Sequence, residues 1–133
     1  MRTISVIRRV LIVDDNHDSA ELLALLLERE GHETRMVHEG REAIAVASAF
    51  QPDIAFLDIG LPDMDGYDLA YALRERPELL NCKFVAVTGH EELCPSSGAA
   101  AFDAHLVKPV DLTAVVRLVA GSTDVGLAKP ASA

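Results

Sequence analysis

Polar or charged side chains follow directly on four separate short apolar runs of this sequence. They are Asp14 and Asp15, Asp58, Thr88 and Lys108. In a parallel sheet the carboxyl ends of the strands share one edge, where ligand sites form, so we expect these side chains to lie close together. One aspartate after a strand is more often a helix N-cap. Four such coincidences instead indicate a functional site.

These residue types suit the handling of a phosphoryl group. Three carboxylates held close together repel one another, and Mg²⁺ relieves the repulsion because it prefers oxygen ligands and keeps several waters. The sequence has no cluster of His and Cys typical of zinc. Lys108 and the hydroxyl of Thr88 would neutralise and hydrogen-bond phosphoryl oxygens. A carboxylate can attack phosphorus, and Asp58 is the best candidate because it is the lone acid on its buried strand.

The elements that must position these residues alternate along the chain. Strand patterns occupy residues 10–13, 33–38, 54–57, 84–87 and 106–107. Helical patterns occupy residues 20–30, 40–50, 67–76 and 91–103, followed by a last helix that Asp111 caps. Strict alternation of this kind predicts an α/β fold in which crossover helices join parallel strands.

Three of these helices carry more specific expectations. Pro95, Ser96, Ser97 and Gly98 interrupt the fourth, so we expect it to be short or irregular. The third should turn Leu69, Ala72 and Leu73 toward the core. The last should bury a face made of Leu112, Val115, Val116 and Val119.

The composition indicates one soluble globular domain. Half of the 133 residues are hydrophobic, and 21 acidic against 12 basic side chains give a formal net charge of −9. An acidic surface repels phosphate backbones, so direct nucleic-acid binding is not expected. No apolar stretch reaches the roughly 18 residues of a membrane span, and Cys82 and Cys94 form no metal or disulfide pattern. The expected location is the cytoplasm.

Several motifs, taken in order, resemble the receiver domain of two-component response regulators. They are Asp14-Asp15, Asp58 with Gly60-Leu61-Pro62 and Asp65-Gly66, Thr88-Gly89, and Lys108-Pro109. The resemblance covers residues 8–120, after an N-terminal extension at 1–7 and before an expected flexible tail at 121–133. It implies a flavodoxin-like, doubly wound, five-stranded parallel sheet of order 2-1-3-4-5. The interval between Thr88 and Lys108 is shorter than is usual in the family, which also predicts a shortened or displaced fourth helix.

The resemblance implies a role for each acid. Asp58 would accept a phosphoryl group from a phosphohistidine on a histidine kinase or a histidine phosphotransfer protein. Asp15 would ligate Mg²⁺ directly and Asp14 largely through water. The backbone carbonyl of Gly60 would complete the protein ligands.

The resemblance also implies a switch. Lys108 would bind the phosphoryl group and Thr88 would move to meet it, while His105 occupies the switch position that is commonly Tyr or Phe. The chain ends soon after the last helix, so we expect no output domain. The output would be a contact with an unknown downstream protein or onward relay of the phosphoryl group. The chain would be a stand-alone receiver or one taken from a hybrid histidine kinase.

Two alternative functions stay open from the residues alone. A small Mg²⁺-dependent phosphohydrolase would use the same aspartyl-phosphate, but haloacid-dehalogenase-type phosphatases place a second acid where this chain has Gly60. A degenerate receiver would act only as a binding module, although all the chemical residues are present. The leading expectation is a phosphoacceptor that is not an enzyme and assists only its own phosphorylation and dephosphorylation.

Overall fold

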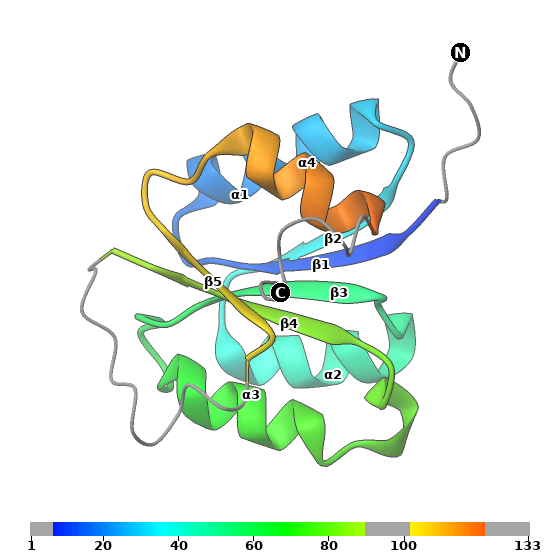
Figure 1. Cartoon of the computed structure of the whole chain (residues 1–133). Helices are drawn as coiled ribbons and strands as arrows, with labels where there is room; N and C mark the ends of the chain where they lie inside the picture. Colours follow the sequence, from blue (N-terminus) through cyan, green and yellow to red (C-terminus); the bar gives the residue numbers. More distant parts are fainter. Residues whose placement is uncertain (1–6, 90–101, 122–133) are drawn as a thin grey trace, which may run out of the picture.

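The computed structural model of the protein describes residues 7–89 and 102–121. Within them, five parallel strands form one sheet in the order β2-β1-β3-β4-β5 (Figure 1). The strands are β1 (Arg9–Val13), β2 (Glu33–Val37), β3 (Ile54–Asp58), β4 (Lys83–Thr88) and β5 (Ala104–Val107). The predicted doubly wound sheet and its strand order are confirmed.

The strands end at the same edge of the sheet because their pairing is in register. Val13 at the end of β1 pairs with Val37 of β2 and with Leu57 of β3. Asp58, one residue further along β3, pairs with Val87 of β4. The carboxyl ends of β1, β3 and β4 therefore lie side by side, as the site requires.

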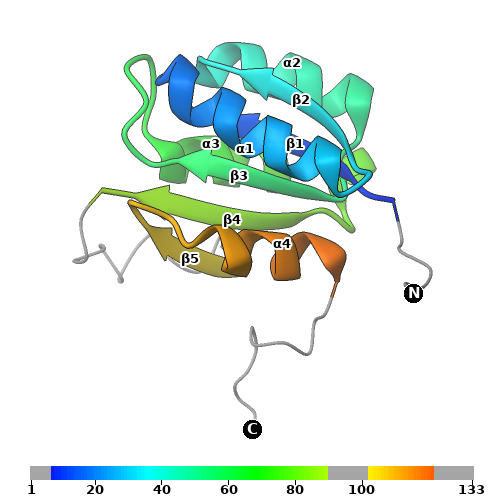
Figure 2. The same cartoon turned by 90° about the horizontal axis from the view of Figure 1, so that it is seen from above.

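Four α-helices and a short 3₁₀ turn are present in the described residues. They are α1 (His17–Arg29), α2 (Gly40–Phe50), α3 (Gly66–Arg74), η1 (Pro77–Leu79) and α4 (Leu112–Ala120). Helices α1 and α4 cover one face of the sheet, and α2 and α3 cover the other (Figures 1 and 2). None of the described helices combines the length and apolar character needed to cross a membrane.

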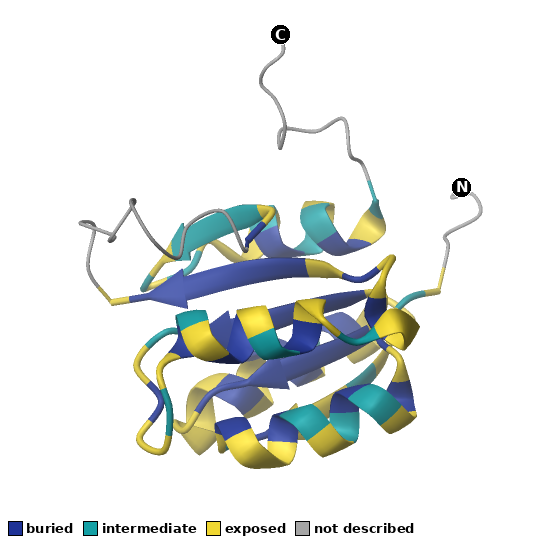
Figure 3. Ribbon diagram, turned by 90° about the horizontal axis from the view of Figure 1, so that it is seen from below, coloured by how far each residue is buried: buried dark blue, intermediate teal, exposed yellow. Residues whose placement is uncertain are grey.

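A separate apolar core fills the space on each side of the sheet. Successive residues of β1 point to opposite faces, so Val10 and Ile12 pack with α1 and α4, while Leu11 and Val13 pack with α2 and α3. The inner strands are buried along almost their whole length, and the helices are buried only on their sheet side (Figure 3). This two-sided burial explains why the strands were continuous apolar runs rather than alternating ones.

A glycine and an aspartate set the ends of two helices. Gly31 ends α1 with a φ of 97°, a left-handed conformation that glycine adopts without steric cost. The side chain of Asp111 accepts a hydrogen bond from the N–H of Thr113 at 2.9 Å and caps α4, as predicted. β2 lies at one edge of the sheet.

Two details of the predicted helix faces are wrong. In α3 the buried alanine is Ala70 and not Ala72, because Ala70 shares the inner stripe with Leu69 and Leu73 at helical spacing. In α4 Leu112 is 36 % exposed, since it stands in the first turn, beyond the edge of the buried face that Val115 and Val119 form.

Other predicted segments end differently or lie outside the description. α3 ends at Arg74 instead of residue 76, because Pro77 forces Arg76 into an extended conformation. Residues 90–101, which include most of the predicted irregular fourth helix, are outside the described residues. The predicted tail lies outside them as well, apart from Gly121.

Candidate functional site

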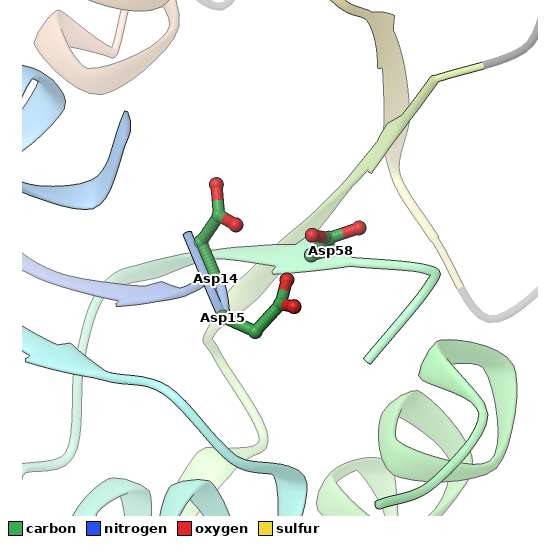
Figure 4. A group of neighbouring side chains, drawn as sticks. All are labelled: Asp14, Asp15 and Asp58. Carbon is green, nitrogen blue, oxygen red and sulfur yellow. The ribbon is translucent and has the colours of Figure 1, made fainter. Parts of the chain in front are cut away.

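The structure brings the predicted site residues to one edge of the sheet. Asp14 follows β1 directly, Asp58 ends β3, Thr88 ends β4 and Lys108 follows β5. The side chains of Asp14, Asp15 and Asp58 project from the ends of β1 and β3 into a common space (Figure 4). The juxtaposition expected from parallel strands is therefore present.

The three carboxylates form a compact acidic cluster. One oxygen from each of Asp14, Asp15 and Asp58 lies within 4.8 Å of the others. Asp14 and Asp58 are each only 7 % exposed, whereas Asp15 is open to solvent. Two oxygens bound to one Mg²⁺ can be at most about 4.2 Å apart, since each Mg–O bond is about 2.1 Å long. The oxygens are close to that spacing and Asp15 is open to solvent, so the residues fit a Mg²⁺ ion that also keeps waters on its open side.

Lys108 places a positive charge against two of these carboxylates. Its Nζ lies 3.3 Å from Oδ2 of Asp58 and 3.5 Å from Oδ2 of Asp14. Burial alone would lower the pKa of Lys108, but the Asp58 and Asp14 carboxylates hold it above its ordinary value. Lys108 is therefore protonated at physiological pH. Three carboxyl groups therefore gather around this one ammonium.

Backbone N–H groups orient the buried carboxylates. Oδ1 of Asp14 accepts a hydrogen bond from the N–H of Asn16 at 2.9 Å, and Oδ1 of Asp58 accepts one from Gly60 at 3.0 Å. Burial raises the pKa of the Asp14 carboxyl, and the bond from Asn16 and the charge of Lys108 offset this only in part. For both aspartates Oδ1 is held by the backbone, while Oδ2 faces Lys108.

Thr88 and His105 occupy the neighbouring strands. Thr88 is 7 % exposed, and its carbonyl accepts the backbone N–H of Lys108 at 2.8 Å. His105 is half-buried on β5 and meets the ring of Phe102 edge to face, with centroids 5.6 Å apart. Its Nε2 is buried and has no hydrogen-bond partner among the described residues. Burial lowers the pKa of His105, which favours a neutral ring.

The site includes two residues that sequence reasoning missed. The Nδ1 of His38 lies 2.8 Å from the backbone carbonyl oxygen of Asp14. The carboxylate of Asp63 binds backbone N–H groups of Gly40 and Arg41 at the start of α2. Both contacts join segments more than twenty residues apart. No local pattern signals such contacts.

A hollow of about 460 Å³ adjoins the cluster on the side of α1 and α4. Asp14 and Lys108 contribute to its wall, and most of the remaining lining is apolar, including Leu22, Phe56 and Leu112. The acidic cluster therefore has an apolar surface on one side.

Comparison with known proteins relates this chain to signalling domains. The family described as "Response regulator receiver domain" matches residues 10–120. The polar-differentiation response regulator DivK of Brucella anthropi is 30% identical over 117 residues, which cover 84% of this chain and 93% of DivK.

Solved structures agree with that match. A CheY-like receiver domain from Methylobacillus flagellatus superposes with a TM-score of 0.79 at 33% identity, over 85% of this chain and 96% of that one. The response regulator TrrA of Thermotoga maritima, solved in complex with Mg²⁺-BeF, has a TM-score of 0.77 at 26% identity, over 85% and 96% of the two chains. With this fold and a match that spans most of its length, the chain belongs to the response regulator receiver domain family, whose members are phosphoacceptor signalling domains.

Proposed function

We propose that Asp58 is the residue of this receiver that accepts the phosphoryl group. The observation that carries the proposal is the convergence of three carboxylates and Lys108 at one edge of the sheet. Asp58 is the acid at the centre of this arrangement, buried on the middle strand and in contact with Lys108. A carboxylate oxygen of Asp58 attacks phosphorus, the bond from phosphorus to the donor nitrogen breaks, and the imidazole leaves with the electron pair.

Asp14, Asp15, Asp58 and the backbone carbonyl of Gly60 are the proposed protein side of a Mg²⁺ site. The close approach of the three carboxylates supports this assignment. Bound Mg²⁺ would supply positive charge to the oxygens of the transferring phosphoryl group. The hydrogen bonds from Asn16 and Gly60 keep the Asp14 and Asp58 carboxylates oriented toward the cluster.

Lys108 and Thr88 are the proposed phosphoryl-binding residues. The ammonium of Lys108 already lies between two carboxylates and can move onto phosphoryl oxygens once Asp58 is modified. Thr88 ends β4, the strand paired with β3, and its hydroxyl is the proposed hydrogen-bond donor to the same group. His105 on β5, which pairs with Ala86 two residues before Thr88, is the proposed switch residue.

The proposed partners follow from the family. Receiver domains exchange phosphoryl groups with histidine kinases or histidine phosphotransfer proteins, and we assign the same class of donor to this chain in the cytoplasm. Residues 8–120 would form the receiver unit. The acidic net charge of −9 favours a downstream protein over nucleic acid as the direct partner. No catalysis is proposed beyond phosphorylation and dephosphorylation of the chain itself, and no observation favours the phosphohydrolase or the degenerate receiver.

One experiment tests the assignment of Asp58. The full chain is incubated with Mg²⁺ and acetyl phosphate, and intact-protein mass spectrometry follows the addition of phosphoryl groups. We expect one added group on the wild type and on Asp53→Asn, and none on Asp58→Asn. Asp53 is a matched control because it lies at the other end of the same strand, outside the acidic cluster. Equal modification of Asp58→Asn would overturn the proposal.

A further inference from the structure

The first turn of α2 is capped by a residue from a different loop. The other three described α-helices are capped by the side chain of their own N-cap residue, Asn16, Asp65 or Asp111. Glu39, the N-cap of α2, makes no such bond. Instead the backbone N–H groups of Gly40 and Arg41 donate to Oδ1 and Oδ2 of Asp63, at 2.8 and 3.0 Å. Asp63 therefore ties the loop between β3 and α3 to the start of α2.

That loop, residues 59–65, is anchored at both its base and its tip. At the base the N–H of Gly66 donates to the carbonyl of Ile59 at 3.0 Å. A Cβ at Gly66 would meet the Cα of Ile59 at 2.6 Å, so the two backbone segments are in direct contact. At the tip the side chain of Met64 packs against Gly40 where any Cβ would overlap it. The contacts of Asp63 and Met64 with α2 thus hold the far end of the loop that carries Gly60.

The same turn before α2 also contacts the other half of the acidic cluster. The Nδ1 of His38 lies 2.8 Å from the carbonyl oxygen of Asp14. Because a carbonyl oxygen can only accept a hydrogen bond, Nδ1 carries the proton and donates the hydrogen bond. The His38 ring stacks on that of His17, the first residue of α1, with centroids 3.7 Å apart and planes 10° from parallel. His38 therefore holds both ends of the turn that contains Asp15.

These contacts act on the parts of the site that the sheet leaves least constrained. Asp14 and Asp58 stand at the ends of adjacent, hydrogen-bonded strands, so strand pairing already sets their spacing. Asp15 and Gly60 lie beyond the strands, in a turn and a loop. Residues 38–41 contact both segments, through His38 on one side and through Gly40 and Arg41 on the other.

We propose that residues 38–41, which supply no ligand themselves, brace the two halves of the Mg²⁺ site, and that Asp63 and His38 are positioning residues for Mg²⁺-dependent phosphorylation. The inference rests on the proposed function and adds to it the residues that order the ligands. Because the brace already orders the ligands, less conformational entropy is lost when the ion binds. The two backbone N–H groups also keep the pKa of Asp63 below its usual range, so the carboxylate stays ionised at physiological pH.

The test measures Mg²⁺ affinity in the absence of any phosphodonor. Amide shifts of the full chain are followed by NMR as Mg²⁺ is added to wild type, Asp63→Ala, Asp63→Asn, His38→Ala and Asp53→Ala. Asp53→Ala is the matched control, because Asp53 also accepts a backbone N–H from a distant segment, that of Arg9 at 2.8 Å, but at the opposite end of the sheet. We expect Asp63→Ala to weaken Mg²⁺ binding about tenfold, the lower end of the effect for residues that support metal ligands. His38→Ala should weaken it in the same direction, and Asp53→Ala should leave it unchanged.

Two further readouts separate bracing from a general loss of stability. Asn retains one acceptor oxygen, so Asp63→Asn should recover part of the lost affinity. With acetyl phosphate, Asp63→Ala should be slow at limiting Mg²⁺ and return close to the wild-type rate at saturating Mg²⁺, because Asp58, Lys108 and Thr88 are intact.

The outcomes also distinguish the brace from the proposed function. If Asp63→Ala binds Mg²⁺ as tightly as Asp53→Ala, or stays slow at saturating Mg²⁺, the brace is refuted while phosphorylation of Asp58 stands. If wild type is not phosphorylated on Asp58, the proposed function fails instead, and only the Mg²⁺ affinities bear on the brace. Faster hydrogen exchange at Gly40 and Arg41 in Asp63→Ala, without weaker Mg²⁺ binding, would show a helix cap and no more, and would also refute the brace.

Discussion

Asp53 precedes the central strand β3 and Asp58 ends it, and the two carboxyl groups differ in burial and in the charges around them. Asp53, just before β3, is exposed, and its Oδ2 accepts the N–H of Arg9 while its own N–H donates to the carbonyl of Arg9, both at 2.8 Å. Asp58, at the end of β3, is 7 % exposed and shares its surroundings with two more carboxylates. The first aspartate ties β3 to β1. The second lies between two further carboxyl groups and the ammonium of Lys108.

The difference extends to the whole of each sheet edge. At the amino edge Glu33 pairs with Arg9 at 3.9 Å and with Arg35, from the middle of β2, at 3.6 Å, and both guanidinium groups lie over the ring of Phe50. Such exposed pairs contribute at most about 1 kcal/mol each. At the carboxyl edge, one oxygen from each of three carboxyl groups lies within 4.8 Å of the others, and Lys108 contacts two of them. The functional edge is therefore distinguished by three carboxyl groups that gather around one ammonium, and not by the number of charged residues.

The largest expected contrast between the two edges is in phosphorylation rate. Lys108→Ala removes the cation that contacts Asp58 and Asp14. Loss of one such group at a developing charge costs about 100-fold in rate. Lys83 is the matched control because it is exposed and starts β4 at the amino edge. We expect Lys83→Ala to be phosphorylated by acetyl phosphate at close to the wild-type rate, measured by intact-protein mass spectrometry of samples quenched over the same time course. Equal slowing of both variants would remove the distinction between the edges.

A smaller effect is expected on the free energy of unfolding without Mg²⁺, where substitutions at the two edges should change it in opposite directions. Asp14→Asn keeps an acceptor for the N–H of Asn16 and removes a buried charge, so the free energy of unfolding should rise by about 1 kcal/mol. Asp53→Ala removes the acceptor of the Arg9 N–H, so the free energy of unfolding should fall by about 1 kcal/mol. Urea unfolding measures both.

Mg²⁺ should make the Asp14→Asn substitution at the carboxyl edge destabilising, and should leave the effect of Asp53→Ala unchanged. Ligand at one hundred times its Kd stabilises a protein by about 2.7 kcal/mol, and Asp14→Asn should forfeit part of that gain. Asp53→Ala should keep all of it. A destabilised Asp14→Asn in the absence of Mg²⁺ would show that the cluster is not strained by like charges.

Much of the fold and of the site could be predicted from the sequence because its determinants are local. Buried apolar runs marked β1, β3 and β4, and the polar residues that follow them converge because the strands are parallel and in register. Asp111 caps α4 and Gly31 ends α1 through bonds within a few residues. Periodicity and turn chemistry carry this information.

What could not be predicted depends on contacts between distant segments. Asp63 reads as an ordinary turn residue next to Pro62, and nothing nearby shows that its carboxylate caps α2. His38 follows β2 as a polar residue, and its bond to the carbonyl of Asp14 depends on how β1 and β2 pair. The inner face of α3 was misassigned by two residues, because Leu69 and Leu73 are compatible with either Ala70 or Ala72 until the helix is docked.

The smallest expected effect concerns pH and a histidine at the amino edge. His32 is 8 % exposed, and its Nδ1 accepts the backbone N–H of Arg8 at 3.0 Å, so the bond requires a ring that is unprotonated at Nδ1. Burial, together with the positive charge of Arg8, lowers its pKa from 6.5. The unfolded chain then binds more protons than the folded one as pH falls below about 6.5, and the stability present above that value is progressively lost. His32→Asn, which can still accept the N–H of Arg8, should flatten the fall in unfolding free energy between about pH 7 and about pH 5. Part of the slope should remain, because burial also lowers the pKa of His105 on β5. A slope identical to wild type in urea unfolding would mean that His32 titrates alike in both states. The amino edge would then contribute no pH dependence through this residue, and the contrast with the carboxyl edge would be sharper still.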